Sequence, residues 1–161
     1  MPALLSPEEL ETHRIALELI RLKLRLPIVE HLTQIHHKPL RLRWRTMHGE
    51  SPPNGKLPES VRSFITGPMS VAELSSFSAM YLRLDREENE KITAAMLLRA
   101  WDMHCRIARR SLDINAAWYA IRDVRSGIVD WRRCGRCQTE FIYDIHASHA
   151  RNCPYCVLAG R

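Results

Sequence analysis

The stretch CGRCQTEFIYDIHASHARNCPYC, residues 134–156, decides how the C-terminal part of this chain folds. It holds two CxxC pairs, Cys134 with Cys137 and Cys153 with Cys156, separated by fifteen residues. This spacing is typical of a four-cysteine zinc site, because each CxxC turn aims two thiolates at one ion and two turns complete a tetrahedron. Between the pairs, apolar and polar residues alternate over 139–145, which predicts a strand with Phe141, Tyr143 and Ile145 on one face. The pattern therefore predicts a small zinc ribbon.

Other uses of these cysteines have to be weighed against zinc. Disulfides need an oxidising compartment, and the N-terminus lacks the pattern of a signal peptide. Iron in a rubredoxin-like site stays open, because its ligand geometry is similar. Four sulfur ligands leave no position for a metal-bound water, so we expect a structural ion rather than a catalytic one. His146 and His149 are expected on the ribbon surface, and Cys105 as a buried small apolar residue.

The residues before the ribbon carry helical patterns and helix caps. Ser6, Pro7 and Glu9 form a capping box that opens a helix expected to run to residue 26, where Pro27 breaks or kinks it. Ser70 and Glu73 suggest a second capping box, and Asp113 and Gly127 suggest the two ends of a later helix. The predicted helices are 6–26, 28–35, 39–48, 71–84, 90–110 and 114–126, with a loop at 49–60.

Two of these helices form a helix-turn-helix-like pair at 28–48, with His36 and His37 at the turn and Pro39 as the first residue of the second helix. The second helix has an apolar face, made by Leu40, Trp44 and Met47, and a basic one. Such a helix suits a major groove, where Arg reads guanine edges and Lys holds phosphates. A merely solvated basic face is the alternative. The predicted DNA-binding residues are Lys38, Arg41, Arg43, Arg45 and His48, with Arg132, Arg133 and Arg136 on the ribbon.

Length and composition fit these elements. The 161 residues suit one domain with a small appendage, and we expect a mainly α fold with a helical domain at 1–130 and a zinc ribbon at 131–161. The net charge of +6 and the pI of about 9.4 favour a polyanionic partner. No apolar run is long enough to span a bilayer, so we expect a cytoplasmic protein. The motifs GxxxxGK[ST], HExxH and GxSxG are missing from the sequence, and we therefore do not expect an enzyme.

Three segments together resemble one known family. They are ALELIRLKLRLPIVEHLT, PLRLRWRTMHG running into ESPPNGKLP, and CGRC with CPYC, and they are similar to FlhC, the flagellar transcriptional activators of proteobacteria. The resemblance implies one zinc bound by Cys134, Cys137, Cys153 and Cys156. It also implies a ring-like hetero-hexamer with a small helical partner, FlhD, which binds promoter DNA and recruits the sigma-70 RNA polymerase. FlhC supplies much of the DNA contact in that family.

The function expected from sequence is therefore a DNA-binding transcriptional activator of flagellar operons, acting with an FlhD-like subunit. In this view the helices at 71–127 form the core and the surface that docks the partner. The alternative is a zinc-ribbon module that binds RNA or another protein, without sequence-specific recognition of DNA. A steep salt dependence of sequence-specific DNA binding would separate the two.

Overall fold

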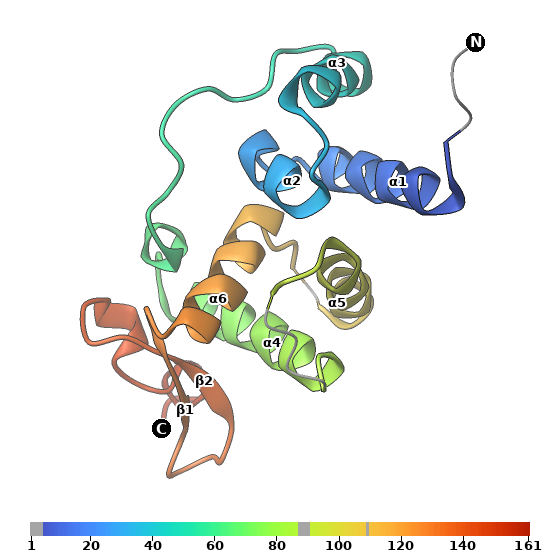
Figure 1. The fold of residues 1–161 in the computed structure, drawn as a ribbon. Helices are drawn as coiled ribbons and strands as arrows, with labels where there is room; N and C mark the ends of the chain where they lie inside the picture. Colours follow the sequence, from blue (N-terminus) through green and yellow to red (C-terminus); the bar gives the residue numbers. More distant parts are fainter. Residues whose placement is uncertain (1–4, 87–90, 109) are drawn as a thin grey trace.

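Helices make up most of the chain, and a two-stranded hairpin follows them (Figure 1). The computed structural model describes residues 5–86, 91–108 and 110–161. The predicted mainly α fold with a small four-cysteine ribbon is confirmed. None of the helices in the described ranges combines the length and apolar character that crossing a bilayer requires. The elements are α1 (Pro7–Arg21), α2 (Leu26–Thr33), α3 (His37–His48), a 3₁₀ turn η1 (Val61–Phe64), α4 (Pro68–Leu84), α5 (Ala94–Ile107), α6 (Ile114–Ser126), β1 (Asp130–Arg133), β2 (Glu140–Tyr143), a 3₁₀ turn η2 (Ser148–Ala150) and α7 (Pro154–Leu158).

Helix α1 begins as predicted but ends earlier than predicted. The Ser6 hydroxyl accepts from the Glu9 N–H, and the Glu9 carboxylate accepts from the Ser6 N–H, so the capping box is confirmed. The expected end at residue 26 is wrong, because Lys23 adopts a left-handed φ of 63° that stops the helix. Pro27 instead lies in the first turn of α2, where the missing N–H of proline costs no hydrogen bond.

The helix-turn-helix-like pair consists of α2 and α3. Gln34 turns the chain with a φ of 60°, and His36 caps α3 by accepting the Lys38 N–H at its ring Nδ1, 3.4 Å away. Pro39 is the third residue of α3 rather than the first, because the imidazole of His36 supplies the cap two residues earlier than predicted. Gly49 ends the helix at a φ of 69°, as predicted.

Helices α4, α5 and α6 form the middle of the molecule (Figure 1). The predicted capping box of α4 is wrong: the helix begins at Pro68, and Ser70 reaches back to accept the Gly67 N–H at 3.1 Å. Helix α5 follows the Thr93 cap; its predicted start at residue 90 lies outside the described residues. The Asp113 cap and the Gly127 terminus of α6 are confirmed.

One apolar core joins the six helices. Its fully buried side chains include Leu19, Trp44, Phe77, Leu97 and Ile121, from α1, α3, α4, α5 and α6. On α1, Ala16, Leu19 and Ile20 face the core, while Leu10 and Leu17 remain exposed. The 49–60 segment is a loop as predicted, and it passes along the outside of the molecule from α3 to η1 (Figure 1).

The ribbon packs directly on α4. Ile142 is fully buried as part of the main core, and its N–H donates to the Ser75 hydroxyl at 3.0 Å. The Tyr155 hydroxyl donates to the Ala72 carbonyl at 3.3 Å. β1 and β2 are antiparallel, with Trp131 opposite Ile142. The predicted strand is confirmed, but its expected apolar and polar faces are wrong: α4 covers Ile142, the cysteines cover Phe141, and Ile145 is exposed.

Candidate metal centre and nucleic-acid interface

The structure brings the four predicted metal ligands together. The Sγ atoms of Cys134, Cys137, Cys153 and Cys156 all lie within 4.8 Å of one another. Cys134 Sγ is 3.8 Å from Cys156 Sγ, and Cys137 Sγ is 3.6 Å from Cys153 Sγ. Four sulfurs at about 2.3 Å from one zinc would stand about 3.8 Å apart in a tetrahedron. The group therefore fits a metal ion without rearrangement of the chain.

Local backbone geometry creates each of the two thiol pairs. In the first, the Cys134 carbonyl accepts the Gln138 N–H at 2.9 Å, and Gln138 has a left-handed φ of 62°. The Arg136 N–H points at Cys134 Sγ, 3.4 Å away, which is the orientation that stabilises a thiolate. In the second, Cys153 precedes α7 and Pro154 starts it, so Cys156 comes round on the first turn.

Aromatic side chains cover the cysteine group. Phe141, Tyr143 and Tyr155 pack against it, and both Cys153 and Cys156 are buried. His146 and His149 are exposed, as predicted, and neither belongs to a group of metal-ligating atoms among the described residues. The sulfurs thus have an apolar cover that limits solvent access to the site.

The thiols of the two pairs differ in acidity. Hydrogen bonds from Thr139 lower the pKa of Cys137 to about 6, and the N–H groups of Cys137 and Arg136 lower the pKa of Cys134. Burial raises the pKa of Cys153, and burial together with the neighbouring thiols raises the pKa of Cys156 to about 12. Four thiolates at neutral pH therefore require a cation among them, because the second pair would otherwise hold its protons.

Helix α3 presents an exposed row of cations. Lys38, Arg41, Arg43 and Arg45 are exposed, and none of them makes an ion pair with another described residue. The helix itself contains no acidic residue. Lys38, Arg41 and Arg45 recur at helical spacing, so they share one face, while Arg43 lies on another. This face is rigidly held, because Leu40 and Trp44 on the same helix are buried in the core.

His48 and Met47 differ in placement from what their spacing suggested. The His48 ring is half-buried: its Nε2 lies 2.9 Å from the Ile20 carbonyl, and its centroid is 4.8 Å from that of Trp44. The ring thus ties the end of α3 to α1. Met47, expected on the apolar face, is 41% exposed. The apolar face is therefore narrower than the sequence indicated.

Within the part of the chain that the structure describes, two of the three ribbon arginines make ion pairs, unlike the arginines of α3. Arg132 pairs with Asp130 at 2.9 Å and lies over the Tyr143 ring, 3.5 Å from its centroid. Arg133 lies 3.7 Å from the Glu140 carboxylate across the hairpin. Arg136 is exposed and has no ion pair with a described residue. All three are on the ribbon surface, as predicted.

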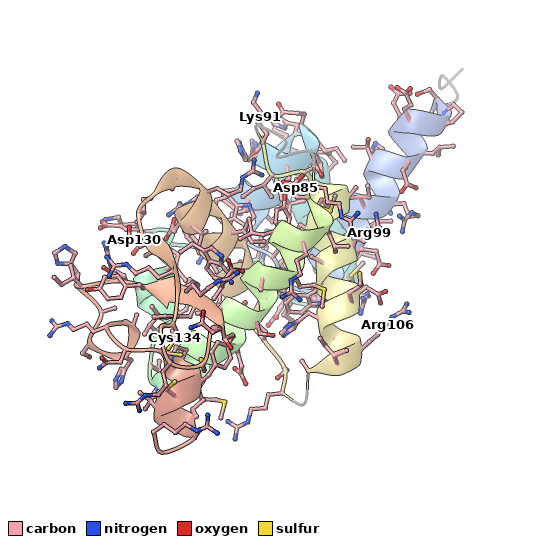
Figure 2. All side chains as sticks on the ribbon, turned by 90° about the horizontal axis from the view of Figure 1, so that it is seen from below. Asp85, Lys91, Arg99, Arg106, Asp130 and Cys134 are labelled. Atoms are coloured by element: carbon pink, nitrogen blue, oxygen red, sulfur yellow. The ribbon has the colours of Figure 1, made fainter. Side chains whose placement is uncertain are left out.

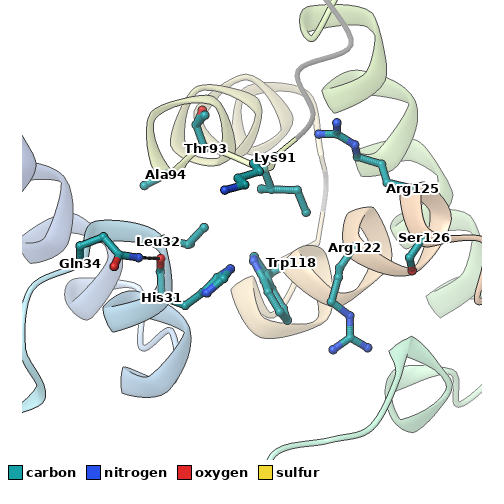
Figure 3. A pocket seen from close by; sticks show the side chains of 11 residues that line it. His31, Leu32, Gln34, Lys91, Thr93, Ala94, Trp118, Arg122, Arg125 and Ser126 are labelled. Carbon is teal, nitrogen blue, oxygen red and sulfur yellow. Dashed lines mark hydrogen bonds between the residues drawn. The ribbon is translucent and has the colours of Figure 1, made fainter.

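A basic cavity of about 700 Å³ lies between α2, α5 and α6 (Figure 3). Lys91, Arg122 and Arg125 line it around Trp118. Arg122 donates to the Glu59 carbonyl at 2.7 Å and Arg125 to Asp85 at 3.2 Å, so both arginines hold the fold together. In Figure 2, Lys91 lies near the top of the view and Cys134 lies well below it, so the cavity and the cysteine group are separate.

Two features escaped the sequence analysis. The carboxylate of Asp144 binds the guanidinium of Arg62, which joins the ribbon to η1 across 82 residues. No periodic signal marks such a pair. Cys105 is exposed rather than buried, so the expectation for it was wrong: it lies near the end of α5 and lines a cavity beside Arg14 of α1 and Leu22.

Comparison with known proteins places the chain among flagellar regulators. The sequence pattern of the family described as "Flagellar transcriptional activator (FlhC)" matches residues 6–161. The "Flagellar transcriptional regulator FlhC" of Sodalis glossinidius is 29% identical over 150 residues, which cover 89% of this chain and 76% of that protein. The proteins of the same name from Proteus mirabilis and Yersinia enterocolitica are 28% and 27% identical over 137 and 157 residues, covering 83% and 94% of this chain and 71% and 79% of theirs.

Proposed function

The chain belongs to the FlhC family of flagellar transcriptional activators, and we propose that it activates flagellar operons by binding their promoter DNA through α3. A regulator of this family acts on DNA and the transcription machinery, and the family is not a class of enzymes. The finer proposal concerns which residues touch DNA, which metal is bound and which proteins assemble with this chain. Lys38, Arg41 and Arg45 would lie against the duplex, with Arg43 on the flank.

The observation that carries this proposal is the set of cations on α3 that make no ion pair within the described ranges of the chain. A guanidinium that already has a carboxylate partner must break that ion pair before it can bind a phosphate. Arg41 and Arg45 have no such partner among the described residues, whereas Arg132 and Arg133 do. Arg136 is the ribbon arginine best placed to add a phosphate contact, and His48 would position α3 rather than touch DNA.

We further propose that the cysteine group holds one structural zinc ion. The spacing of the sulfurs and the all-thiolate ligand set support zinc, and leave no ligand position for a reacting water. When bound, the ion supplies a tetrahedral cross-link between the two CxxC turns. Ile142 and Tyr155 then hold the ribbon, residues 131–161, against the helical part, residues 1–130, through their hydrogen bonds to α4.

The proposal includes partners. We propose that the chain assembles with an FlhD-like subunit, in a hetero-hexamer, and that the complex recruits the sigma-70 RNA polymerase in the cytoplasm. Apolar side chains that remain exposed support a protein partner, because their burial would stabilise an assembly. They include Leu10 and Leu17 on α1 and Met103 and Ile107 on α5.

The test is the salt dependence of promoter binding by the co-purified complex. Each phosphate contact contributes a slope of about −0.9 in log K against log salt concentration. We expect Lys38→Ala, Arg41→Ala and Arg45→Ala each to weaken binding to a flagellar promoter fragment. The slope should become shallower by about 0.9 for a residue that binds a phosphate. The matched control is Arg14→Ala, an exposed arginine on α1 that should leave the slope unchanged.

Two outcomes would count against the proposal. Promoter binding that is unchanged in a variant with Lys38, Arg41 and Arg45 all replaced by alanine would remove α3 from the interface. Tighter binding to single-stranded RNA than to promoter DNA would favour the zinc-ribbon module as the function. Elemental analysis of the same samples should give one zinc per chain. This result would show that either outcome was obtained with a metal-filled ribbon rather than a metal-free one.

A further inference from the structure

The turn between α2 and α3 carries a second group of metal-ligating side chains. Ligand atoms of Glu30, His36 and His37 lie within 4.8 Å of one another. Among the described residues, this group and the four cysteines are the two sets of three or more such side chains that meet this limit. Nothing in the activator function uses the two imidazoles or the carboxylate together.

Glu30 is already held in position for a ligand role. Its Oε1 accepts the His37 N–H at 3.1 Å and lies 3.9 Å from His37 Nδ1. The carboxylate comes from the last turn of α2, and His37 is the first residue of α3. An ion at this point would therefore bridge the two helices across the turn.

The two imidazoles are close and reachable from solvent. The ring centroids of His36 and His37 are 4.1 Å apart, with the rings tilted by 41°. The side chains of His37 and Glu30 are 46% and 39% exposed. His36 Nδ1 accepts a long hydrogen bond of 3.4 Å from the Lys38 N–H, so little is lost when the ring turns to present a nitrogen to an ion.

The chemistry of the three ligands selects the ion. Two imidazole nitrogens and one carboxylate suit zinc, cobalt, nickel and copper ions, whereas calcium and magnesium prefer sites built from oxygen. Three protein ligands leave one position of a tetrahedron open to water. Lys38 and Arg41 lie nearby on α3, and their positive charges weaken cation binding, so this site is weaker than the cysteine site.

We propose that Glu30, His36 and His37 form a second, exchangeable site for a divalent cation of the zinc class, which fastens α2 to α3. An ion that binds the folded chain and not the unfolded chain stabilises the fold by mass action. The thermal midpoint of unfolding therefore rises with the concentration of the free ion. The proposal concerns the ion and the two helices, so it stands apart from DNA binding.

The test counts zinc on the whole chain in its natural assembly, with the cysteine site filled. Equilibrium dialysis against increasing free zinc should give two ions per wild-type chain and one per chain of a His36→Asn, His37→Gln variant. Asparagine keeps a side-chain acceptor at the start of α3, so this helix retains its cap. The matched control, His13→Gln, alters an exposed histidine on α1 and should keep two ions.

A second readout identifies the ligands. Cobalt added to the zinc-filled chain should give the visible absorption of a nitrogen and oxygen site, and should raise the thermal midpoint of wild type but not of the double variant. Glu30→Gln gives an independent test if the double variant does not fold, and it should also bind one ion. The proposal is overturned if wild type binds a single zinc at saturation, or if the variants with altered ligands still bind two.

Discussion

The ion pair between Asp144 and Arg62 should account for much of the attachment of the ribbon to the helical part. The Asp144 side chain is 4% exposed and that of Arg62 is 38% exposed. Asp144→Asn removes the charge but keeps an oxygen that can accept the His146 N–H, now at 3.0 Å. The change therefore isolates the contact with Arg62, which also donates to the Ile128 carbonyl at 3.1 Å.

The expected cost follows from the partial exposure of Arg62. A hydrogen bond to a charged group contributes about 1.5–3 kcal/mol to stability, and solvent around the guanidinium reduces this to about 1–2 kcal/mol. Arg62→Met should cost more, about 3 kcal/mol, because it leaves a buried carboxylate without its partner. The double variant should lose less than the sum of the two single losses, since the second change removes a group already unpaired.

The assay is urea unfolding of the zinc-filled chain, followed by far-ultraviolet circular dichroism, for the two single variants and the double variant. Arg14→Met is the matched control, because its ion pair with Glu11 is exposed and should contribute nothing measurable. Strictly additive losses in the cycle would refute the coupling between Arg62 and Asp144.

The pH dependence supplies a second check. Burial would raise the pKa of Asp144, but the Arg62 guanidinium and the His146 N–H together hold it below its ordinary value. A depressed pKa means that the stabilising charge is fully present above the unfolded pKa of about 3.9 and is lost only as the pH falls through the lower folded value. The difference between wild type and Asp144→Asn should thus stay constant from about pH 5 to pH 8. A difference that shrinks within this window would contradict the assignment.

Three further predictions concern the helices. Trp44 is 1% exposed, so Trp44→Ala should cost about 3–5 kcal/mol in urea unfolding and weaken promoter binding by loosening α3; unchanged stability would contradict the packing described. Asn115 accepts the Arg25 N–H at 2.9 Å and donates to the Lys23 carbonyl at 3.1 Å, so Asn115→Ala should cost about 1–2 kcal/mol in the same assay. A maleimide should label the zinc-filled chain at Cys105 alone. Labelling should become faster as the pH rises and the thiolate fraction grows, since partial desolvation and the nearby Asp102 carboxylate raise the pKa of this thiol; mass spectrometry would reveal any second labelled site.

Local signals in the sequence predicted the parts of the fold that depend on neighbouring residues. The capping box at Ser6, the cap at Asp113 and the terminus at Gly127 involve hydrogen bonds within a few positions, and the sequence alone determines them. The four cysteines were equally predictable, because the spacing within each pair is a property of one turn. The helix-turn-helix-like pair was predicted from apolar periodicity and from Pro27 and Pro39, which lie in the first turns of its two helices.

Features that depend on long-range packing were beyond the sequence. The early end of α1 depends on Leu24 entering the core, and periodicity through residue 26 gave no sign of it. The strand pattern put Ile142 on the face opposite Phe141 and Tyr143 and gave no sign of what would cover it, yet α4, far away in the sequence, does so. The sequence contains Glu30, His36 and His37 but does not indicate that they meet, because the turn at Gln34 brings their side chains together.

The docking of β2 on α4 has a consequence for synthesis on the ribosome. α4 ends at Leu84 and β2 begins at Glu140. At a translation rate of about 5–20 residues per second, the ribosome therefore reaches β2 roughly 3–11 seconds after it completes α4, and until then the surface of α4 around Ser75 has no strand packed on it. During that interval Phe77 and its neighbours can pack with α5 and α6, but the side of α4 that faces the ribbon remains exposed to solvent. On the proposal that a zinc ion holds the ribbon together, the supply of metal during translation would determine how promptly this last surface closes.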